Sequence, residues 1–333
     1  MAKRVAINGF GRIGRNFFRV AVNKPDIEIV SINDLFETKY LAYVLKYDTV
    51  FGRFDGTVES KEGALIVNGK EIPITAERDP ANLKHGDNNI DVVVESTGFF
   101  TKRDAAAKHL DAGAKRVLVS APSPDPDFTV VLGCNDEKIK DDHKIISNAS
   151  CTTNCLAPIV KVLNESFGIK QGLMCTIHSY TGNQKPVDTA RSGPPIKMTR
   201  GRACAANILP TSTGAAKAIG KVFPDLDGKL DGYAMRVPTP DGSVVDLKAT
   251  VDATPSVKEV NQKMKEASQG ALEGILDYTE DPIVSSDIIG NPHSSIFCPL
   301  FTKVINDLVF VLSWYDNEWG FSNRMAELII KHL

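Results

Sequence analysis

Three glycines with the spacing G-x-G-x-x-G, at positions 9, 11 and 14, constrain the fold of this 333-residue chain more than any other feature. A short apolar run at residues 3–8 precedes them, and apolar residues at helical spacing over residues 12–22 follow. Glycines between a strand and a helix permit a tight turn, close approach of a pyrophosphate to the backbone, and close helix–strand packing. The N–H groups and the positive dipole end of such a helix then face the phosphates. This pattern predicts a dinucleotide-binding turn.

An acidic residue supports this interpretation. Asp34 lies 20 residues beyond Gly14, where a second apolar run ends. A carboxylate at that place bonds both ribose hydroxyls of a dinucleotide. It also repels a 2′-phosphate, so the sequence favours NAD over NADP. The alternative is a chance cluster of glycines in an ordinary strand–helix turn.

The first half of the chain alternates apolar runs with helical patterns. Strands are expected at residues 3–8, 27–32, 91–98 and 116–120, and helices at 12–22, 38–46 and 102–112. Such alternation predicts right-handed βαβ units and a parallel sheet. With the glycine turn, it indicates an α/β, Rossmann-type doubly wound sheet. Asn68-Gly69 predicts a β-hairpin inserted at residues 63–74.

The second half has strands in succession, which predicts an α+β domain with a mixed or antiparallel sheet. Strands are expected at residues 173–179, 232–237, 243–251 and 307–314, and helices at 151–167, 212–222 and 256–269. Residues 185–202 lack periodicity and are expected to form a long irregular loop, a kind of segment that is usually functional. We therefore expect a first domain over residues 1–150 and a catalytic domain over 151–316. A helix at 317–333 is expected to pack back on the first domain.

Composition excludes several other classes. Lys and Arg number 39 against 41 Asp and Glu, a net charge of -2, whereas nucleic-acid and polybasic membrane binders cluster positive charge. No apolar run approaches the ~20 residues of a membrane helix, and the first residues do not resemble a signal peptide. Six cysteines are too few for a disulfide scaffold in a chain this long, so a cytoplasmic protein is expected. No metal-binding motif is present, so no metal is expected.

Cys151 is the leading candidate nucleophile. Asn148 and Ser150 are good N-cap residues, and the helical pattern starts at Cys151. A thiol in the first turn of a helix is stabilised as thiolate, with pKa values that fall from about 8.5 to as low as ~3.5–7.5. Cys155 lies one turn further on and is expected to be a small packed core residue. A metal site at this C-x-x-x-C lacks two further ligands.

A nucleophilic cysteine requires a base. Six histidines are available, and any of them, taken singly, fits a surface or core position. His178 is distinguished because it ends the strand expected at residues 173–179, and strand ends are where sites are built. Spacing alone leaves the choice open.

Six motifs together resemble the phosphorylating glyceraldehyde-3-phosphate dehydrogenases, in order and over the whole length. They lie at residues 7–15 (INGFGRIGR), 147–155 (SNASCTTNC), 178–181 (HSYT), 210–217 (PTSTGAAK), 236–240 (RVPTP) and 313–318 (SWYDNE). The resemblance implies oxidation of D-glyceraldehyde 3-phosphate to 1,3-bisphosphoglycerate with NAD and inorganic phosphate, in glycolysis and gluconeogenesis. It also implies a cytoplasmic homotetramer.

The resemblance assigns roles to single residues. Cys151 would form a thiohemiacetal and then a thioester, and His178 would lower the thiol pKa and act as the base. The Cys151 backbone N–H would stabilise the oxyanion. The residues implied for the substrate phosphate and inorganic phosphate are Ser150, Thr152, Thr181, Arg200, Thr213, Gly214 and Arg236. The residues implied for the cofactor are Gly9, Gly11, Arg12, Ile13, Gly14, Asp34, Arg78, Ser120 and Asn317.

Some positions depart from the family pattern, and rival functions stay open. The 185–202 loop is longer than usual, and Ala190, Thr199 and Phe321 stand where many members have proline, arginine and tyrosine. Erythrose-4-phosphate dehydrogenase is the nearest alternative, although residues 180–181 and 212–215 have the form of the first family. A nucleotide-binding or RNA-binding scaffold would show salt-sensitive nucleic-acid affinity and indifference to Cys151 alkylation. A redox-sensing thiol protein is the third alternative.

Overall fold

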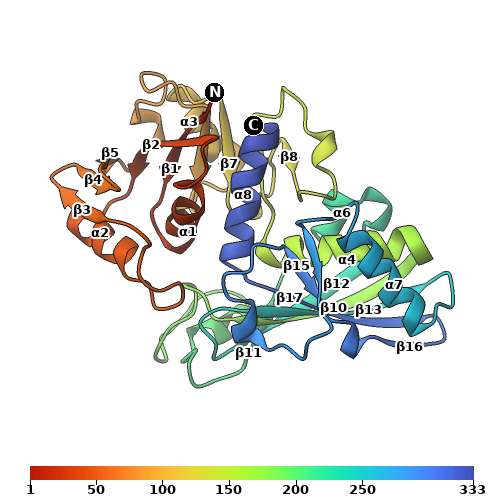
Figure 1. Ribbon diagram of the computed structural model, residues 1–333. Helices are drawn as coiled ribbons and strands as arrows, with labels where there is room; N and C mark the ends of the chain where they lie inside the picture. Colours follow the sequence, from red (N-terminus) through yellow and green to blue (C-terminus); the bar gives the residue numbers. More distant parts are fainter. The chain divides into compact units, whose positions relative to one another are not determined.

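The computed structural model describes residues 1–333 and divides into two compact units. The first unit comprises Met1–Val130, Asp136–Ala149 and Ser322–Leu333, and the second comprises Val131–Asn135 and Ser150–Phe321 (Figure 1). The last helix, α8 (Trp319–His332), therefore contributes most of its length to the first unit. None of the helices is both long and apolar enough to traverse a lipid bilayer.

The first unit is built on a mainly parallel sheet with the strand order β3-β4-β5-β2-β1-β6-β7-β9-β8. Its strands are β1 (Lys3–Asn8), β2 (Ile27–Asn33), β3 (Val58–Lys61), β4 (Ala64–Val67), β5 (Lys70–Thr75), β6 (Val92–Glu95), β7 (Arg116–Val119), β8 (Phe128–Thr129) and β9 (Ile145–Ser147). Its helices are α1 (Arg12–Ala21), α2 (Thr38–Lys46) and α3 (Arg103–Asp111). β1 pairs in parallel with both β2 and β6, as in a doubly wound sheet, and this confirms the predicted fold class.

The predicted hairpin is present between β4 and β5. These strands are antiparallel, and Asn68 and Gly69 between them have φ of 51° and 78°. Positive φ at both central residues is the requirement of a type I′ turn, which explains the Asn-Gly pair. β3, β4 and β5 thus extend the parallel sheet with an antiparallel edge.

The second unit contains a sheet with the main strand order β11-β12-β10-β13-β17-β15-β14. Its strands are β10 (Ile169–Ser179), β11 (Leu209–Ser212), β12 (Leu230–Val237), β13 (Ser243–Val251), β14 (Leu276–Tyr278), β15 (Ser295–Phe297), β16 (Lys303–Ile305) and β17 (Leu308–Tyr315). Its helices are α4 (Cys151–Phe167), α5 (Pro195–Met198), α6 (Ile219–Val222) and α7 (Val257–Ser268). β10 is parallel to β12 and antiparallel to β13, so the sheet is mixed, as predicted.

Two expectations for this unit are wrong. Residues 212–222 were expected to be one helix, but they complete β11, turn, and form only the four-residue α6. Strand pairing takes Ser212 out of the expected helix, because it pairs with Tyr233 of β12, and a turn at residues 215–218 precedes α6. The 185–202 segment is not wholly irregular, since it contains α5 and a 3₁₀ turn at Thr199–Gly201.

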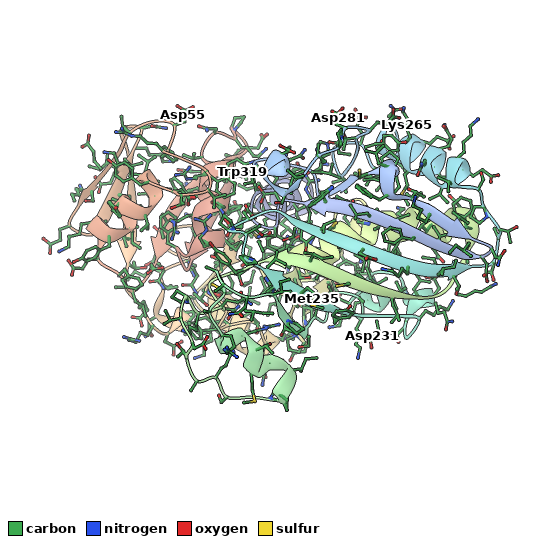
Figure 2. The ribbon with its side chains drawn as sticks, turned by 90° about the horizontal axis from the view of Figure 1, so that it is seen from below. Asp55, Asp231, Met235, Lys265, Asp281 and Trp319 are labelled. Carbon is green, nitrogen blue, oxygen red and sulfur yellow. The ribbon has the colours of Figure 1, made fainter.

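One face of this second sheet is covered by α4 and α7, and the other is open (Figure 1). Seen from below in Figure 2, the strands present side chains and no helix crosses them. Exposure alternates along β10: Leu173 is 67 % exposed, whereas Met174 and His178 are buried. The alternation turns His178 toward the α4 side, which is where the candidate site is built.

Candidate active site

The glycine turn of the first unit has the geometry that its sequence predicts. A Cβ on Gly9, whose φ is 91°, would lie 2.7 Å from the backbone nitrogen of Thr97, and a Cβ on Gly14 would lie 2.1 Å from the Gly9 carbonyl oxygen. Around Gly11, in contrast, nothing lies within 4 Å of the Cβ position. Two glycines are therefore required by packing, and the third leaves open space beside the start of α1, where a phosphate has room to approach.

A cavity of about 570 Å³ lies beside this turn, lined by Gly9, Gly11, Asp34 and Arg78. The Asp34 carboxylate accepts hydrogen bonds from the backbone N–H of Phe10 (2.7 Å) and of Phe36 (3.1 Å). These bonds fix the carboxylate at the cavity wall, where a ribose would meet it. Aromatic side chains, Phe36 and Phe99 among them, and the Arg78 side chain complete a lining suited to an adenosine group.

Three further cofactor candidates lie at or near this turn. Arg12 opens α1 and is paired with Asp48, with its guanidinium 5.7 Å from the Phe51 ring centroid. Ile13 follows in the first turn and is half-buried. Ser120 follows β7, and its backbone N–H donates to the Glu95 carbonyl at 2.9 Å. Because Arg12 is paired with Asp48, it is not a free cation at the first turn of α1.

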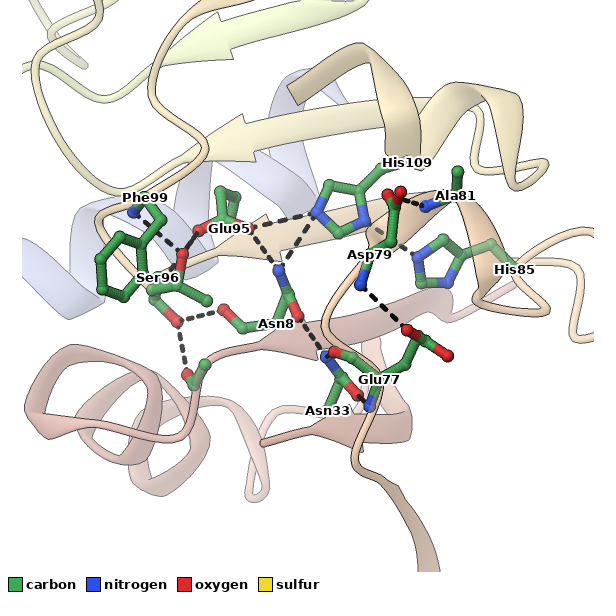
Figure 3. A network of polar contacts seen from close by, with 12 residues as sticks. Asn8, Asn33, Glu77, Asp79, Ala81, His85, Glu95, Ser96, Phe99 and His109 are labelled. Carbon is green, nitrogen blue, oxygen red and sulfur yellow. Dashed lines mark hydrogen bonds and ion pairs between the residues drawn. The ribbon is translucent and has the colours of Figure 1, made fainter. Parts of the chain in front are cut away.

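Beneath the cavity lies a buried polar network that the sequence analysis missed (Figure 3). One Glu95 oxygen accepts from the Thr97 N–H (2.8 Å) and hydroxyl (2.5 Å), and the other from the Asn8 amide (2.5 Å). The Asn8 oxygen accepts from the Asn33 amide at 2.7 Å, and Asn33 in turn bonds both backbone groups of Glu77. One buried carboxylate thus organises both walls of the cavity, because Glu77 and Thr97 both line it.

Two buried histidines continue the network away from the cavity. His109 Nε2 lies 3.1 Å from the Glu95 carboxylate, and His109 Nδ1 lies 3.1 Å from His85 Nε2. Burial, followed by the neighbouring His109, lowers the pKa of His85 to about 4. A neutral His85 donating to His109, which donates to Glu95, satisfies each nitrogen along this path.

The candidate nucleophile of the second unit lies where the sequence places it. Cys151 is the first residue of α4, and the Ser150 hydroxyl caps the helix by accepting from the Thr153 N–H at 3.0 Å. The Cys151 sulfur is 3.5 Å from His178 Nε2. Of the six histidines, His178 is the one that lies at hydrogen-bonding distance from this sulfur, which spacing alone could not establish.

Strand register places a cation beside the same imidazole. His178 of β10 is directly opposite Arg236 of the parallel strand β12. Arg236 Nη1 is 2.8 Å from His178 Nδ1 and 2.8 Å from the Ser179 carbonyl oxygen. His178 Nδ1 is itself 2.8 Å from that carbonyl. The imidazole therefore bridges the sulfur and a guanidinium.

Tyr315 of β17 completes the surroundings of His178. Its ring meets the imidazole edge-on, with centroids 5.8 Å apart and planes at 89°. Its hydroxyl is 2.9 Å from the hydroxyls of both Thr152 and Thr176. The Thr152 hydroxyl, implied for the inorganic-phosphate site, is thus engaged within the buried core.

The structure does not show the expected fall in the pKa of the Cys151 thiol. Burial raises the pKa of the Cys151 thiol, against the opposing effects of the Arg236 charge and of hydrogen bonds from Thr152. Burial, followed by the charges of Arg236 and Arg200, lowers the pKa of His178 well below its usual value. Desolvation disfavours the charged form of each of these two groups. Burial likewise raises the pKa of Cys155 to about 12, as expected of a packed core thiol.

The remaining phosphate candidates are Arg200, Thr181, Thr213 and Gly214, and the charge of Arg200 acts on His178. Arg200 is held by its Nε on the Thr211 hydroxyl and its Nη2 on the Ser212 carbonyl, both at 2.9 Å. Thr181 donates both its N–H (2.7 Å) and its hydroxyl (3.1 Å) to Gln184. Thr213 accepts from the Ala215 N–H, and Gly214 has open space on its Cβ side. Arg236 and Arg200 both act electrostatically on His178, so two cations converge on the site.

Asn317 is held in one orientation by two hydroxyls. Its Oδ1 accepts from Ser179 Oγ at 2.7 Å and from Ser243 Oγ at 2.6 Å. The amide oxygen is thereby occupied, and the NH₂ group is the part left to bind a ligand carbonyl. A nicotinamide carboxamide has such a carbonyl. No three His, Cys, Asp or Glu side chains are arranged to hold a metal ion.

Comparison with known proteins identifies the family. Residues 150–317 match the model of the glyceraldehyde 3-phosphate dehydrogenase C-terminal domain, and residues 3–103 match that of its NAD binding domain. The chain belongs to the glyceraldehyde-3-phosphate dehydrogenase family. Glyceraldehyde-3-phosphate dehydrogenase 1 of Bacillus subtilis is 54 % identical over 330 residues, which cover 98 % of this chain and 97 % of the relative. The glyceraldehyde-3-phosphate dehydrogenase of Geobacillus stearothermophilus has the same identity and coverage. That of Mycobacterium tuberculosis is 53 % identical over 336 residues, covering 99 % of this chain and 98 % of the relative.

Membership of the glyceraldehyde-3-phosphate dehydrogenase family confirms the predicted resemblance and the NAD cofactor. The first unit contains the residues that match the NAD binding domain, and the cavity at Asp34 lies among them. Sequence reasoning missed Ser179, Ser243 and Tyr315 as parts of the site. For Ser179 the available signal was its position directly after His178. For Ser243 and Tyr315 it was the pairing of β13 with β17, which places the two residues opposite each other.

Proposed function

We propose that this chain oxidises D-glyceraldehyde 3-phosphate, with NAD and inorganic phosphate, to 1,3-bisphosphoglycerate in glycolysis and gluconeogenesis. The observation that carries the proposal is the Cys151–His178 pair, 3.5 Å apart, beside Arg236 at the ends of β10 and β12. An imidazole next to a thiol at a helix start provides both the base and the nucleophile that acyl chemistry requires.

The first step forms a bond between sulfur and carbon. The Cys151 sulfur attacks the aldehyde carbon, the thiol proton passes by way of His178 to the former carbonyl oxygen, and a thiohemiacetal results. The backbone N–H of Cys151, at the start of α4, stabilises negative charge on that oxygen. His178 Nε2 then removes the hydroxyl proton while the carbon loses a hydride, leaving a thioester.

Bound NAD supplies what the chain lacks, an acceptor for the hydride. The residues that would hold it are those of the glycine turn with Asp34, Arg78 and Ser120, and Asn317 at the carboxamide. Inorganic phosphate then attacks the thioester carbon, the carbon–sulfur bond breaks, and the acyl phosphate leaves. His178 returns its proton during this step, and Cys151 is regenerated.

We propose two anion sites, with the residues that the family resemblance implies. Arg236 and Thr181 are proposed for the phosphate of the substrate. Ser150, Thr152, Thr213, Gly214 and Arg200 are proposed for inorganic phosphate, with Thr152 contributing its backbone N–H because its hydroxyl is engaged. Guanidinium groups bind such oxyanions bidentately.

We further propose a cytoplasmic homotetramer. All six cysteines are free thiols, as a reducing compartment would maintain them. The open face of the second sheet carries Leu173 and Tyr233, which are 67 % and 47 % exposed. Burying such a face against another copy of the chain would remove this apolar area from water.

The test is the formation of NADH, followed spectrophotometrically, from D-glyceraldehyde 3-phosphate with phosphate present or omitted. Turnover that depends on phosphate supports the proposal, and absence of NADH formation contradicts it. D-erythrose 4-phosphate in a parallel assay tests the sister activity, which no observation favours.

A further inference from the structure

Two buried acids flank the support of Asn317. Asp241 lies in the turn between β12 and β13, two residues before Ser243, and Asp316 follows β17 and directly precedes Asn317. The Ser243 hydroxyl is one of the two that donate to the Asn317 amide oxygen, at 2.6 Å. Asp241 and Asp316 are only 2 % and 1 % exposed, and their carboxyl groups are in hydrogen-bonding contact with each other. Two acids in such contact cannot both be ionised at low cost.

Asp316 is the carboxylate of this pair. Its Oδ1 accepts from the backbone N–H groups of Glu318 (2.9 Å) and Trp319 (2.6 Å), and its Oδ2 accepts from that of Gly290 (2.8 Å). Burial raises the pKa of Asp316, and these three bonds oppose that rise. Because N–H donors on both oxygens stabilise the charged form, the negative charge of the pair belongs on Asp316.

Asp241 is the acid that keeps a proton. Its Oδ1 accepts from the adjacent Gly242 N–H at 2.8 Å, but its Oδ2 is buried and receives no hydrogen bond from any N–H or O–H group. Burial, followed by the negative charges of Asp316 and Glu318, raises the pKa of Asp241 to about 9. A neutral Asp241 donates its proton to Asp316, which turns a repulsive contact into a charge-assisted hydrogen bond.

The charges that act on Asp241 are of one sign. Asp316 and Glu318 act on its pKa as negative charges, and no cation is among the groups that do. The Cys151 thiol also responds to Asp241, since negative charge on Asp241 raises the pKa of that thiol. Ionisation of Asp241 would therefore add a buried charge with nothing to balance it.

The contact between the two acids involves a closely packed turn. Gly242, whose φ is 84°, is so near Ser285 that a Cβ on it would lie 2.4 Å from the Ser285 carbonyl oxygen. The turn cannot carry Asp241 to solvent without disturbing this packing. Repulsion between two ionised acids would instead separate the backbone segments that carry Ser243 and Asn317.

We propose that Asp241 is a positioning residue for the nicotinamide end of the cofactor, and that it acts as a neutral acid. Its proton fastens the β12–β13 turn to Asp316, which keeps the Ser243 hydroxyl on Asn317 and leaves the Asn317 NH₂ group oriented for a carboxamide. The proposal rests on the proposed function, in which Asn317 receives that carboxamide. Loss of the proton should weaken binding of the nicotinamide and leave the cavity at Asp34 in the first unit unchanged.

The experiment compares the affinity of the full-length protein for NADH and for ADP-ribose between pH 7.5 and pH 10, by calorimetric titration. NADH is stable in alkali and carries the carboxamide, whereas ADP-ribose has the same adenosine and pyrophosphate groups without nicotinamide. One pH unit above a pKa of about 9, about a tenth of the protein keeps the proton, so the Kd of the wild type for NADH should rise about tenfold. The Kd for ADP-ribose should change by less than about twofold, because the adenosine site lies in the other unit.

Asp241→Asn is the decisive variant, because its amide donates to Asp316 at every pH in this range. It should bind NADH within about twofold of the wild type at pH 7.5 and should lose the weakening in alkali. Asp241→Ala has no donor and should bind NADH about tenfold more weakly already at pH 7.5, with its affinity for ADP-ribose unchanged. Asp281→Asn, which neutralises an exposed acid of the same unit, is the matched control and should keep the wild-type profile.

Weaker binding of NADH by Asp241→Asn at pH 7.5 would show that an ionised Asp241 is required, and this would overturn the proposal. A wild-type affinity for NADH that is constant up to pH 10, or a loss in alkali that Asp241→Asn retains, would overturn it as well. Cys151 is present in both proteins, so an effect of its own titration would be among those that Asp241→Asn retains. The affinity for ADP-ribose reports in each variant that the protein is folded. Neither aldehyde nor phosphate is used, so failure of the dehydrogenase assay and failure of this test are separate results.

Discussion

At the scale of single residues, Ser179 connects the two halves of the chemistry. Its carbonyl oxygen lies 2.8 Å from both His178 Nδ1 and Arg236 Nη1, and its hydroxyl donates to the Asn317 amide oxygen. The base and the residue proposed for the nicotinamide therefore share one support at the end of β10. A change in the backbone at Ser179 would disturb proton transfer and cofactor orientation together.

Cys151→Ser should abolish NADH formation from D-glyceraldehyde 3-phosphate, with a loss on the order of 10⁴-fold or more. A serine hydroxyl is far less acidic than a thiol and forms no thioester. Affinity for NAD, measured by fluorescence quenching, should stay within about twofold, because the adenosine-site residues lie in the first unit. A variant that retains more than a hundredth of the activity would contradict the role of Cys151.

Asp34→Gly should raise kcat/KM for NADP about tenfold and lower it for NAD, because the change removes the charge that opposes a 2′-phosphate and the acceptor for ribose hydroxyls. Steady-state kinetics with both cofactors measure the effect. Glu37→Ala is the control, since Glu37 is a nearby exposed acid outside the cavity lining. Equal changes in the two variants would show that general charge, and not Asp34, selects the cofactor.

At the scale of elements, the network of Glu95, His109 and His85 joins β6 to α3 and to the segment before β6. Burial lowers the pKa of His85 to about 4, below its ordinary 6.5. The unfolded chain therefore binds a proton between these values that the native protein does not. The network should stabilise the first unit fully above pH 6.5 and progressively less as the pH falls toward 4.

Unfolding by urea at pH 7 and at pH 4.5 measures this dependence. The wild type should lose at most about 3 kcal/mol through His85 over this range. His85→Gln keeps a donor for His109 and removes the titrating group, so the loss should shrink by that amount. An unchanged difference between the two pH values in His85→Gln would show that other groups cause the acid sensitivity.

Sequence reasoning succeeded for elements with strong local periodicity or a clear cap. α4 and β13 begin and end where they were predicted, because Ser150 caps the helix and apolar residues recur along both. It failed where pairing decides the structure. The helix predicted at residues 212–222 begins on the last residue of β11 and is largely replaced by a turn. β8 and β9, with two and three residues, are too short to show any period.

The same contrast between local sequence signals and strand pairing holds for the site. Cys151 and His178 could be named from a helix start and a strand end. The neighbours that tune them could not, since the contact of Arg236 with His178 depends on the β10–β12 register. The rise in the pKa of the Cys151 thiol also depends on burial, which the position of Cys151 at a helix start does not indicate.

At the scale of the whole molecule, the open face of the second sheet carries apolar side chains that the folding of one chain leaves exposed. Leu173 lies opposite Asp231 of β12 and Lys248 of β13, so an exposed leucine is flanked by charges of both signs. A face that mixes apolar area with paired charges suits association with a second copy of itself.

Leu173→Glu should shift the protein from the proposed tetramer toward smaller species, because it places an unpaired charge in the proposed interface. Light scattering coupled to gel filtration measures the mass, and circular dichroism checks that the secondary structure is kept. Val257→Glu, on the exposed start of α7, is the matched control and should leave the mass unchanged. Dissociation by the control, or a full-size Leu173→Glu assembly, would contradict an interface on this face.

The central place of β10 also bears on where such a chain can gain or lose residues. Hydrogen bonding on both edges fixes its register, and a slip of one position would turn His178 to the far side of the sheet. Insertions and deletions within β10 should therefore inactivate the protein even where substitutions are tolerated. In the 185–202 segment, isolated backbone bonds such as that from the Thr189 N–H to the Gly201 carbonyl oxygen replace a continuous ladder. We therefore expect differences in length among relatives to concentrate there.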